Sequence, residues 1–191
     1  MAKNFLYVLP LLCCFAQCGN MNNAGANIYS AALVINEIDK KDAAITNDTT
    51  AYKRFEGAWF YIDYPADFTA LPLLKSLTSS EGYDSALFTS PDGKIKFYVF
   101  SPQWSGNPSE INLKGNEKII NSTASYGEDS MLIKHWTIEA HDKSYRRSYQ
   151  ETKLIHNVNW IIGIEYSDSA QYNQYKNEYI HFKNSLLQFA D

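Results

Sequence analysis

Cysteine is almost absent from this sequence, and the few present are confined to its beginning. Cys13, Cys14 and Cys18 are its three cysteines, and none follows in the rest of the 191 residues. A domain built from the later residues therefore has no disulfide, no thiolate metal site and no cysteine nucleophile.

Recognisable catalytic and metal-binding motifs are absent as well. The four histidines (His135, His141, His156 and His181) stand apart from one another, and no His-x-x-x-His or His-Glu-x-x-His pattern occurs. There is no Gly-x-Ser-x-Gly nucleophile elbow, and the nine glycines form no phosphate-binding loop. We therefore expect no catalytic residue, no metal and no cofactor, and predict that the protein is not an enzyme. A hydrolase whose site is assembled from residues far apart in the sequence stays open as an alternative.

An excess of positive charge is also lacking. The 17 lysines and arginines are outnumbered by 21 aspartates and glutamates, which gives a net charge of −4. Binding to the phosphates of a nucleic acid depends on a concentration of positive charge. Nucleic acid is therefore excluded as an expected partner.

The sequence has no hydrophobic run long enough to cross a bilayer. The longest, residues 5–15 with Pro10 inside it, falls short of the roughly 20 apolar residues that a span needs. Following Lys3, it instead has the length of the hydrophobic region of a secretory signal. We expect the protein to be exported.

Two ways of processing this signal remain open. Residues 15–20, Phe-Ala-Gln-Cys-Gly-Asn, resemble a bacterial lipoprotein box, in which Cys18 becomes the lipidated first residue. The alternative is cleavage after Ala26, where Ala-Gly-Ala has the small-x-small form. The first predicts a protein held in the cell envelope by an N-terminal lipid, on the periplasmic face or the cell surface. The second predicts a secreted protein.

The chain divides into three parts by composition. Residues 1–17 are predicted to be the lipoprotein signal peptide. Residues 18–53 are rich in Asn, Gly, Ala and Thr and are expected to form a tether. Residues 54–191 suit a single domain by length and composition.

Aromatic residues are plentiful in that domain, with 14 Tyr and 10 Phe in the chain, and they favour sheet. Short turn signals separate the apolar segments, so we expect five or six mostly antiparallel strands. The turn Ser-Pro-Asp-Gly at 90–93 predicts a hairpin. The predicted strands are 59–64, 86–90, 95–101, 131–140, 144–153 and 160–166, with a less certain one near 118–122.

The last strand and the segment after it anchor this interpretation. Residues 160–166, Trp-Ile-Ile-Gly-Ile-Glu-Tyr, are apolar on both faces, which is typical of a central strand. The residues after Ser169 repeat large apolar side chains at helical spacing, so we predict one long helix over 169–189 lying on the sheet. The repeat consists of Tyr172, Tyr175, Tyr179, Phe182, Leu186 and Phe189.

The order of these segments resembles the PsbP-like fold family. The resemblance rests on Asp-Tyr-Pro-x-Asp-Phe at 63–68, on the hairpin that leads into Phe-Tyr-Val-Phe-Ser at 97–101, and on Tyr166, Ser169 and the final helix. It implies an α+β fold: an α/β/α sandwich with a curved, mostly antiparallel sheet of five to six strands and a long C-terminal helix. It also implies a non-enzymatic binding or assembly factor, here as a bacterial exported lipoprotein.

Three residues are candidates for binding. Trp104 lies in a loop rich in Gly and Pro, where an exposed ring suits stacking on a sugar or a protein. Lys143 and Arg147 belong to a locally basic hairpin at 143–153, although adjacent Arg146 and Arg147 must point to opposite faces of a strand. The alternatives are a tryptophan folded onto the sheet, a solvated hairpin, and an arginine paired with an acid.

These observations predict a non-enzymatic, membrane-anchored extracytoplasmic lipoprotein that acts as a protein-binding or assembly module. Its expected partners are the membrane, through the lipid, and a protein of the cell envelope. The alternative is a surface lipoprotein that binds a carbohydrate or another small ligand.

Overall fold

The computed structural model describes residues 50–104, 106–127, 131–154 and 159–189. These belong to a unit that runs from Asp48 to Asp191. The predicted signal peptide and Cys18 lie outside the described residues, as does most of the predicted tether. The tether was expected to end at residue 53, and the first strand begins at Tyr52.

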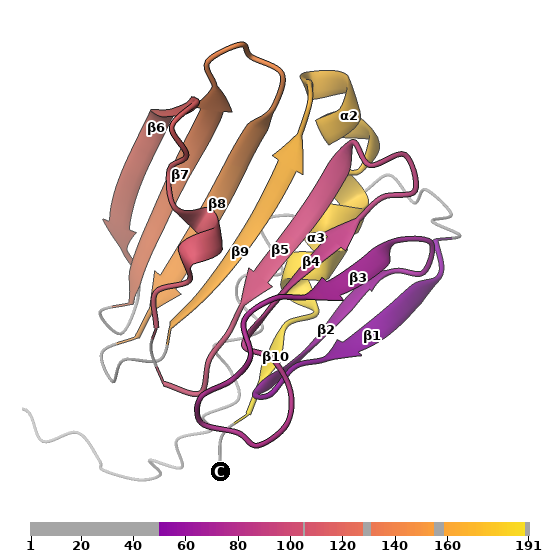
Figure 1. Cartoon of the computed structure of the whole chain (residues 1–191), viewed down its shortest axis with the longest axis vertical. Helices are drawn as coiled ribbons and strands as arrows, with labels where there is room; N and C mark the ends of the chain where they lie inside the picture. The colour runs from indigo at the N-terminus through magenta and orange to yellow at the C-terminus, as the bar shows by residue number, and fades with distance from the viewer. Residues whose placement is uncertain (1–49, 105, 128–130, 155–158, 190–191) are drawn as a thin grey trace, which may run out of the picture. The chain divides into compact units, whose positions relative to one another are not determined.

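The described residues form two antiparallel sheets and very little helix (Figure 1). The smaller sheet has the order β1-β2-β10, and the larger has the order β3-β4-β5-β9-β8-β7-β6. The strands are β1 (Tyr52–Glu56), β2 (Phe60–Pro65), β3 (Thr69–Pro72), β4 (Ser85–Thr89), β5 (Ile95–Phe100), β6 (Glu117–Tyr126), β7 (Leu132–Ala140), β8 (Arg146–Lys153), β9 (Asn159–Tyr166) and β10 (Leu187–Gln188).

Several predictions about strands are confirmed. All pairs in both sheets are antiparallel. The hairpin through Pro91 joins β4 to β5, with Gly93 at φ 72° as the turn requires. Strand β9 has β5 on one side and β8 on the other, which makes it the middle strand of the larger sheet.

The α/β/α sandwich with five to six strands and a long C-terminal helix is wrong. The structure is mostly β, with sheets of three and seven strands. Residues 169–189 form two short helices, α2 (Ser169–Gln174) and α3 (Lys176–Asn184), and then strand β10. Beyond them, the described helix is limited to the 3-10 turn η2 (Ser109–Ile111).

The C-terminal helix ends earlier than predicted because the residues after it contact β2 of the smaller sheet. The backbone leaves helical geometry at Tyr175, with φ −106° and ψ 15°. At the end of α3, the Ser185 hydroxyl accepts a hydrogen bond of 2.8 Å from the backbone N–H of Asp63 in β2. The chain then extends, and the Phe189 ring lies 4.9 Å from the Tyr61 ring. Large apolar residues therefore continue at helical spacing in the sequence beyond Asn184, where α3 ends.

Two hydrophobic cores lie on opposite faces of the larger sheet. On the first face, Tyr179 and Phe182 of α3 pack with β2, β4, β5 and β9. On the second face, Tyr98, Phe100, Ile138, Tyr149 and Ile161 are covered in part by Ile111 of η2. Figure 1 shows α3 on one side of the sheet and the η2 turn on the other. A helix covers one face, and an irregular loop takes the place of the second helical layer.

Candidate functional site

The pairing register divides the first face of the larger sheet into a covered half and an open half. Ile162 and Ile164 of β9 belong to the core beneath α3. Directly opposite them in β8 stand Gln150 and Ser148. Directly paired side chains point to the same face of a sheet. The first face is therefore apolar at β9 and polar at the neighbouring strand β8.

The polar side chains continue across the next two strands as two rows. The first row runs from Gln150 to His135 on β7 and Thr123 on β6. The second row consists of Ser148, Thr137 and Asn121. Five of these six side chains are uncharged amides or hydroxyls, and the other is an imidazole. We call these six residues the polar rows.

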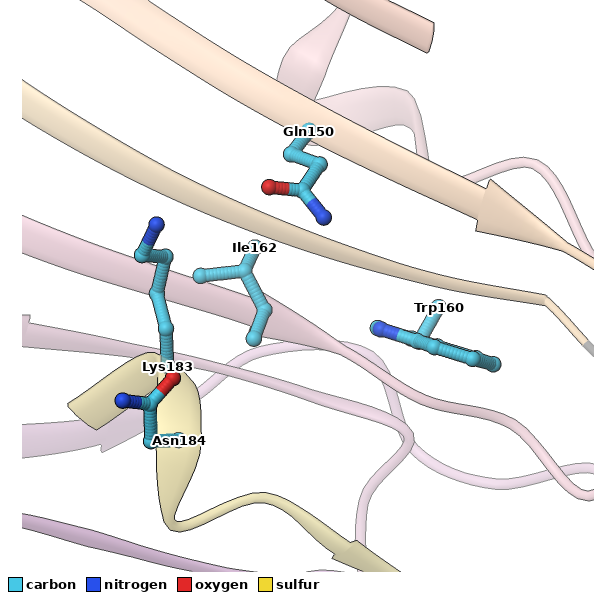
Figure 2. A pocket seen from close by; sticks show the side chains of 5 residues that line it. All are labelled: Gln150, Trp160, Ile162, Lys183 and Asn184. Atoms are coloured by element: carbon cyan, nitrogen blue, oxygen red, sulfur yellow. The ribbon is translucent and has the colours of Figure 1, made fainter. Parts of the chain in front are cut away.

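Between α3 and the start of the rows lie two adjoining hollows, which we call the α3 groove. One has a volume of about 210 Å³ and is lined by His135, Ser148, Tyr149, Gln150, Ile164, Tyr166, Tyr172, Tyr179 and Lys183. The other has a volume of about 120 Å³ and is lined by Gln150, Trp160, Ile162, Lys183 and Asn184. Figure 2 shows the second, with Gln150 on β8 facing Lys183 and Asn184 of α3 across β9.

Local structure explains why α3 brings Lys183 to this border. Phe182 is fully buried under the helix, and the next residue is rotated about 100° around a helix axis. Lys183 therefore lies at the edge of the buried stripe, with its ammonium 5.4 Å from the centre of the Tyr179 ring. On the adjoining side, the Tyr166 and Tyr172 rings lie 5.3 Å apart.

The groove offers hydrogen bonds and ring faces, and Lys183 adds a positive side chain to both of its hollows. Among the described residues, neither lining contains Asp or Glu. Burial raises the pKa of Tyr179, so its hydroxyl stays neutral at physiological pH. Ser148 and Thr137 share a hydrogen bond of 3.0 Å, which fixes two hydroxyls of the second row. Such a surface suits binding of a polar ligand.

A larger hollow, of about 470 Å³, lies on the second face. It is lined by Asn107, Pro108, Ile111, Asn112, Lys134, Trp136, Glu151, Lys153 and Ile161. The Trp136 ring is stacked against Tyr149 at 5.3 Å, and the Lys134 ammonium lies 5.4 Å from its centre. Protein groups therefore already contact this ring.

The far edge of the larger sheet is an exposed strand. β6 has ten residues, and all except Glu117 are exposed. Its pairing with β7 shifts between Ile119 and Asn121, after which the register is regular to Tyr126. The opposite edge, β3, has four residues and ends at Pro72. In the sheet as described, the outer backbone groups of β6 have no strand partner.

The residues singled out from the sequence are not brought together. Trp104 is 54% exposed, and its backbone carbonyl accepts a hydrogen bond from the N–H of Asn159. Lys143 is exposed in the turn between β7 and β8 and has a positive φ of 62°. Cys18 lies outside the described residues. Arg147, the third candidate for binding, is buried.

Arg147 holds the loop of the second face against the sheet. Its guanidinium donates to the Glu117 carboxylate at 2.5 Å, to the Tyr149 hydroxyl at 3.0 Å, and to the backbone carbonyls of Glu110 and Asn112. Tyr145 donates to the same carboxylate at 2.6 Å. The paired-arginine alternative thus describes Arg147, which has little surface left for a ligand.

The Glu117 carboxylate is ionised in this arrangement. Burial alone raises its pKa, but hydrogen bonds from Tyr145, the Lys114 N–H and Arg147, together with the charge of Arg147, outweigh burial and lower the pKa. Arg146 points to the other face and pairs with Glu139 at 2.8 Å. The two adjacent arginines therefore lie on opposite faces, as strand alternation requires.

Reasoning from the sequence missed the α3 groove and the polar rows. A signal was present, because Thr137 and His135 alternate with Trp136 and Ile138, and Ser148 and Gln150 alternate with Arg147 and Tyr149. Such alternation predicts a strand with one polar face. It does not reveal which polar faces lie side by side, since that depends on the register between distant segments.

Comparison with known proteins finds similar structures and no similar sequence. No family model matches the chain, and no curated protein matches it. The structure is similar to that of cyanobacterial PsbP (CyanoP) from Synechocystis, with a TM-score of 0.43 and 12% identity, over 73% of this chain and 94% of that one. It is also similar to a crystal structure from Bacteroides thetaiotaomicron, with a TM-score of 0.38 and 15% identity, over 73% of this chain. This match spans about half of the Bacteroides chain, 49%.

The first of these similarities is to a PsbP, the family that the order of motifs resembles. Both TM-scores lie below 0.5, so no argument about this chain rests on either one.

The described part of the chain contains neither a cluster of metal ligands nor a membrane-spanning helix. No group of three or more His, Cys, Asp or Glu side chains there is placed to hold a metal ion. The same residues include no helix with the length and hydrophobicity that a bilayer span requires.

Proposed function

We propose that this chain is a non-catalytic, extracytoplasmic protein-binding module, anchored through a lipid on Cys18, and that β6 is its docking strand. The observation that carries the proposal is the exposed edge of the larger sheet. An unpaired edge strand can add a strand from another protein through main-chain hydrogen bonds. The regular stretch from Asn121 to Tyr126 is the part that does so.

The contrast with β3 supports this choice. Proteins protect sheet edges by keeping them short or by placing proline and charge on them. β3 is short and ends in Pro72, whereas β6 is long and has no proline. From Ile119 to Tyr126 it has no charged residue either, and Lys118 already lies 3.6 Å from Glu139.

The chemistry of the partner follows from that of the strand. The side chains of Asn121, Thr123 and Ser125 point to the polar face, and those of Ser122, Ala124 and Tyr126 point to the other. An extended, uncharged segment with hydroxyl-bearing or β-branched residues would match both faces without burying an unpaired charge. We therefore expect an uncharged extended segment of an envelope protein.

Photo-crosslinking in cells tests the docking strand. A photoreactive residue is placed at Ser122 or Thr123, and the matched control places it at Leu71 on the opposite edge, where the side chain is 54% exposed. We expect a discrete adduct from positions 122 and 123 that is absent from position 71. Ala124→Lys should abolish the adduct without changing the unfolding midpoint, because a charge blocks strand addition at an exposed position.

Two other outcomes would overturn the proposed docking. Equal labelling from position 71 would mean that β6 is not a preferred edge. An adduct with the mass of two copies of this chain would make β6 a self-association strand in place of a docking strand for another protein.

The anchor has its own test. We expect radiolabelled palmitate to be incorporated into the wild-type protein and Cys18→Ala to abolish the labelling. Unlabelled wild-type protein would remove the lipid from the proposal and leave the secreted form.

A further inference from the structure

We infer that the connection between β3 and β4, residues 73–84, is a membrane-contact loop that inserts Leu77 into the bilayer in which the anchor lies. We call these residues the Leu77 loop. The inference rests on the proposed lipid on Cys18, which keeps the domain close to a bilayer, and it does not use the docking strand β6. The loop would give the domain a second contact with the membrane.

The side chain at the tip of the loop is almost fully exposed. Leu77 is 97% exposed, and Leu74 and Tyr83, on the two arms of the loop, are each 37% exposed. A single exposed apolar side chain is common on proteins and does not by itself mark a site. What sets Leu77 apart is how firmly the loop around it is held.

Hydrogen bonds on both sides of Leu77 hold the tip in place. The indole N–H of Trp59, a buried residue, donates to the Ser76 hydroxyl at 3.3 Å and to the Thr78 hydroxyl at 2.8 Å. Ser76 also donates its backbone N–H to the Gly82 carbonyl at 3.3 Å. Because both neighbours of Leu77 are bound to the same buried side chain, the leucine stays exposed.

The arms of the loop are fixed to the rest of the domain. The Asp84 N–H donates to the Leu74 carbonyl at 2.7 Å, and the Ala58 N–H, just before β2, donates to the Tyr83 carbonyl at 2.9 Å. Gly82 has a positive φ of 87°, and an added Cβ would lie 2.8 Å from the Cα of Ala58. This close approach therefore requires glycine. A loop that is already ordered loses little conformational entropy when it binds.

The shape and charge of the loop favour a bilayer as the occupant. In Figure 1 the loop extends past the ends of β1 and β2, at the bottom of the view. A projecting leucine is only partly buried against a flat protein surface, whereas lipid chains can surround it. The exposed charged residues of the loop, Lys75 and Glu81, have opposite signs. Contact should therefore depend on the apolar side chain and not on anionic lipid headgroups.

The anchor offsets the small size of this contact. Burial of one leucine corresponds to a dissociation constant weaker than about 1 mM, so the loop would not hold a free protein on a membrane. A second contact joined to an anchor acts at an effective concentration on the order of millimolar. Insertion of Leu77 is therefore expected in the anchored protein and not in a free one.

Fluorescence quenching of the full, processed protein in neutral phosphatidylcholine vesicles tests this inference. The reporter is a polarity-sensitive fluorophore on Ser80→Cys, an exposed position of the loop that leaves Leu77 in place. Processing at Cys18 removes Cys13 and Cys14 and blocks the Cys18 thiol, so the label is confined to position 80. We expect blue-shifted emission and quenching by nitroxides on the lipid acyl chains, both unchanged by added salt because the contact is apolar.

Two variants of the labelled protein give the matched comparison. Leu77→Ser should abolish the blue shift and the quenching, because the apolar tip is lost. Leu113→Ser removes a leucine that is 51% exposed outside the loop, and both signals should stay at the level of the wild type. Both substitutions are at exposed positions, so the thermal midpoint, measured alongside, should stay unchanged.

Several results would overturn the inference. Quenching that persists in Leu77→Ser, or an unquenched label on protein that carries palmitate, would remove the loop from the membrane and leave the anchor in place. Protein that lacks palmitate and stays off the vesicles would overturn the anchor and the inference together. A blue shift that grows with the density of protein at constant lipid would mean that a second copy of the chain covers Leu77.

Discussion

The two halves of the larger sheet share a backbone pattern but have opposite side-chain chemistry. From β4 through β5 to β9, the face under α3 contains Phe88, Phe97, Ile162 and Ile164, all buried. From β8 to β6, the same face contains Gln150, His135 and Thr123, which are half-buried or exposed. The larger sheet is therefore wider than the layer that covers it. The covered half stabilises the fold, and the open half is available for recognition.

The largest effect on the free energy of unfolding is expected in the core beneath α3, in the covered half. Phe182 is fully buried between the Phe88 and Phe97 rings, at centroid distances of 5.3 and 5.1 Å. Phe182→Ala should lower the free energy of unfolding by about 4 kcal/mol, through lost burial and the cavity left behind. Urea denaturation measures this loss. The control Ile180→Ala, on the same helix at 40% exposure, should cost less than about 1 kcal/mol.

A smaller effect is expected from the polar network on the second face. Glu117→Gln breaks the buried pair with Arg147 and should cost about 3 kcal/mol, because an uncompensated buried charge remains. Glu139→Gln removes a pair with the more exposed Arg146 and should cost about 1 kcal/mol or less. Equal losses in the two variants would show that the buried network does not hold the loop.

The same network predicts a dependence of stability on pH. The pKa of Glu117 is lowered from its ordinary value of 4.5 in the folded protein, so its contribution is present above that pH. The contribution is lost as the pH falls through the lowered value, because the unfolded state then binds more protons. Denaturation curves from pH 7 to pH 3 should show a shallower loss for Glu117→Gln than for the wild type.

The smallest effect is expected on the open half. Thr123→Ala and His135→Ala remove exposed side chains of the first polar row and should each change the free energy of unfolding by less than about 0.5 kcal/mol. Losses of 2 kcal/mol or more, measured by the same denaturation, would mean that these rows are part of the structural core. The proposed difference in stability between the two halves of the sheet would then be contradicted.

The sequence predicted the centre of the sheet better than its borders. The apolar residues of β9, the hairpin through Pro91 and the strands at 131–140 and 144–153 leave strong local patterns. β6 was uncertain because its polar alternation, with a shift near Ile120, resembles a loop. The helix was overextended because Leu186 and Phe189 continue the spacing while the chain turns to pair with β2. Contacts with β2 therefore end the helix before residue 189.

The candidate site was less predictable than the fold. Arg147 was recognised as an arginine that can pair with an acid, but its partner Glu117 lies 30 residues away. The α3 groove combines side chains from β7, β8, β9 and both helices. No spacing within one segment indicates such a site, since the register between β7, β8 and β9 brings its residues together.

Residue-resolved native-state hydrogen exchange tests the division of the sheet most directly. We expect amides of β5 and β9 to exchange only through global unfolding, whereas amides of β6 should exchange through local opening at a much lower free energy. Equal protection of β6 and β9 would contradict the account, because the open half would then be as firmly held as the covered one.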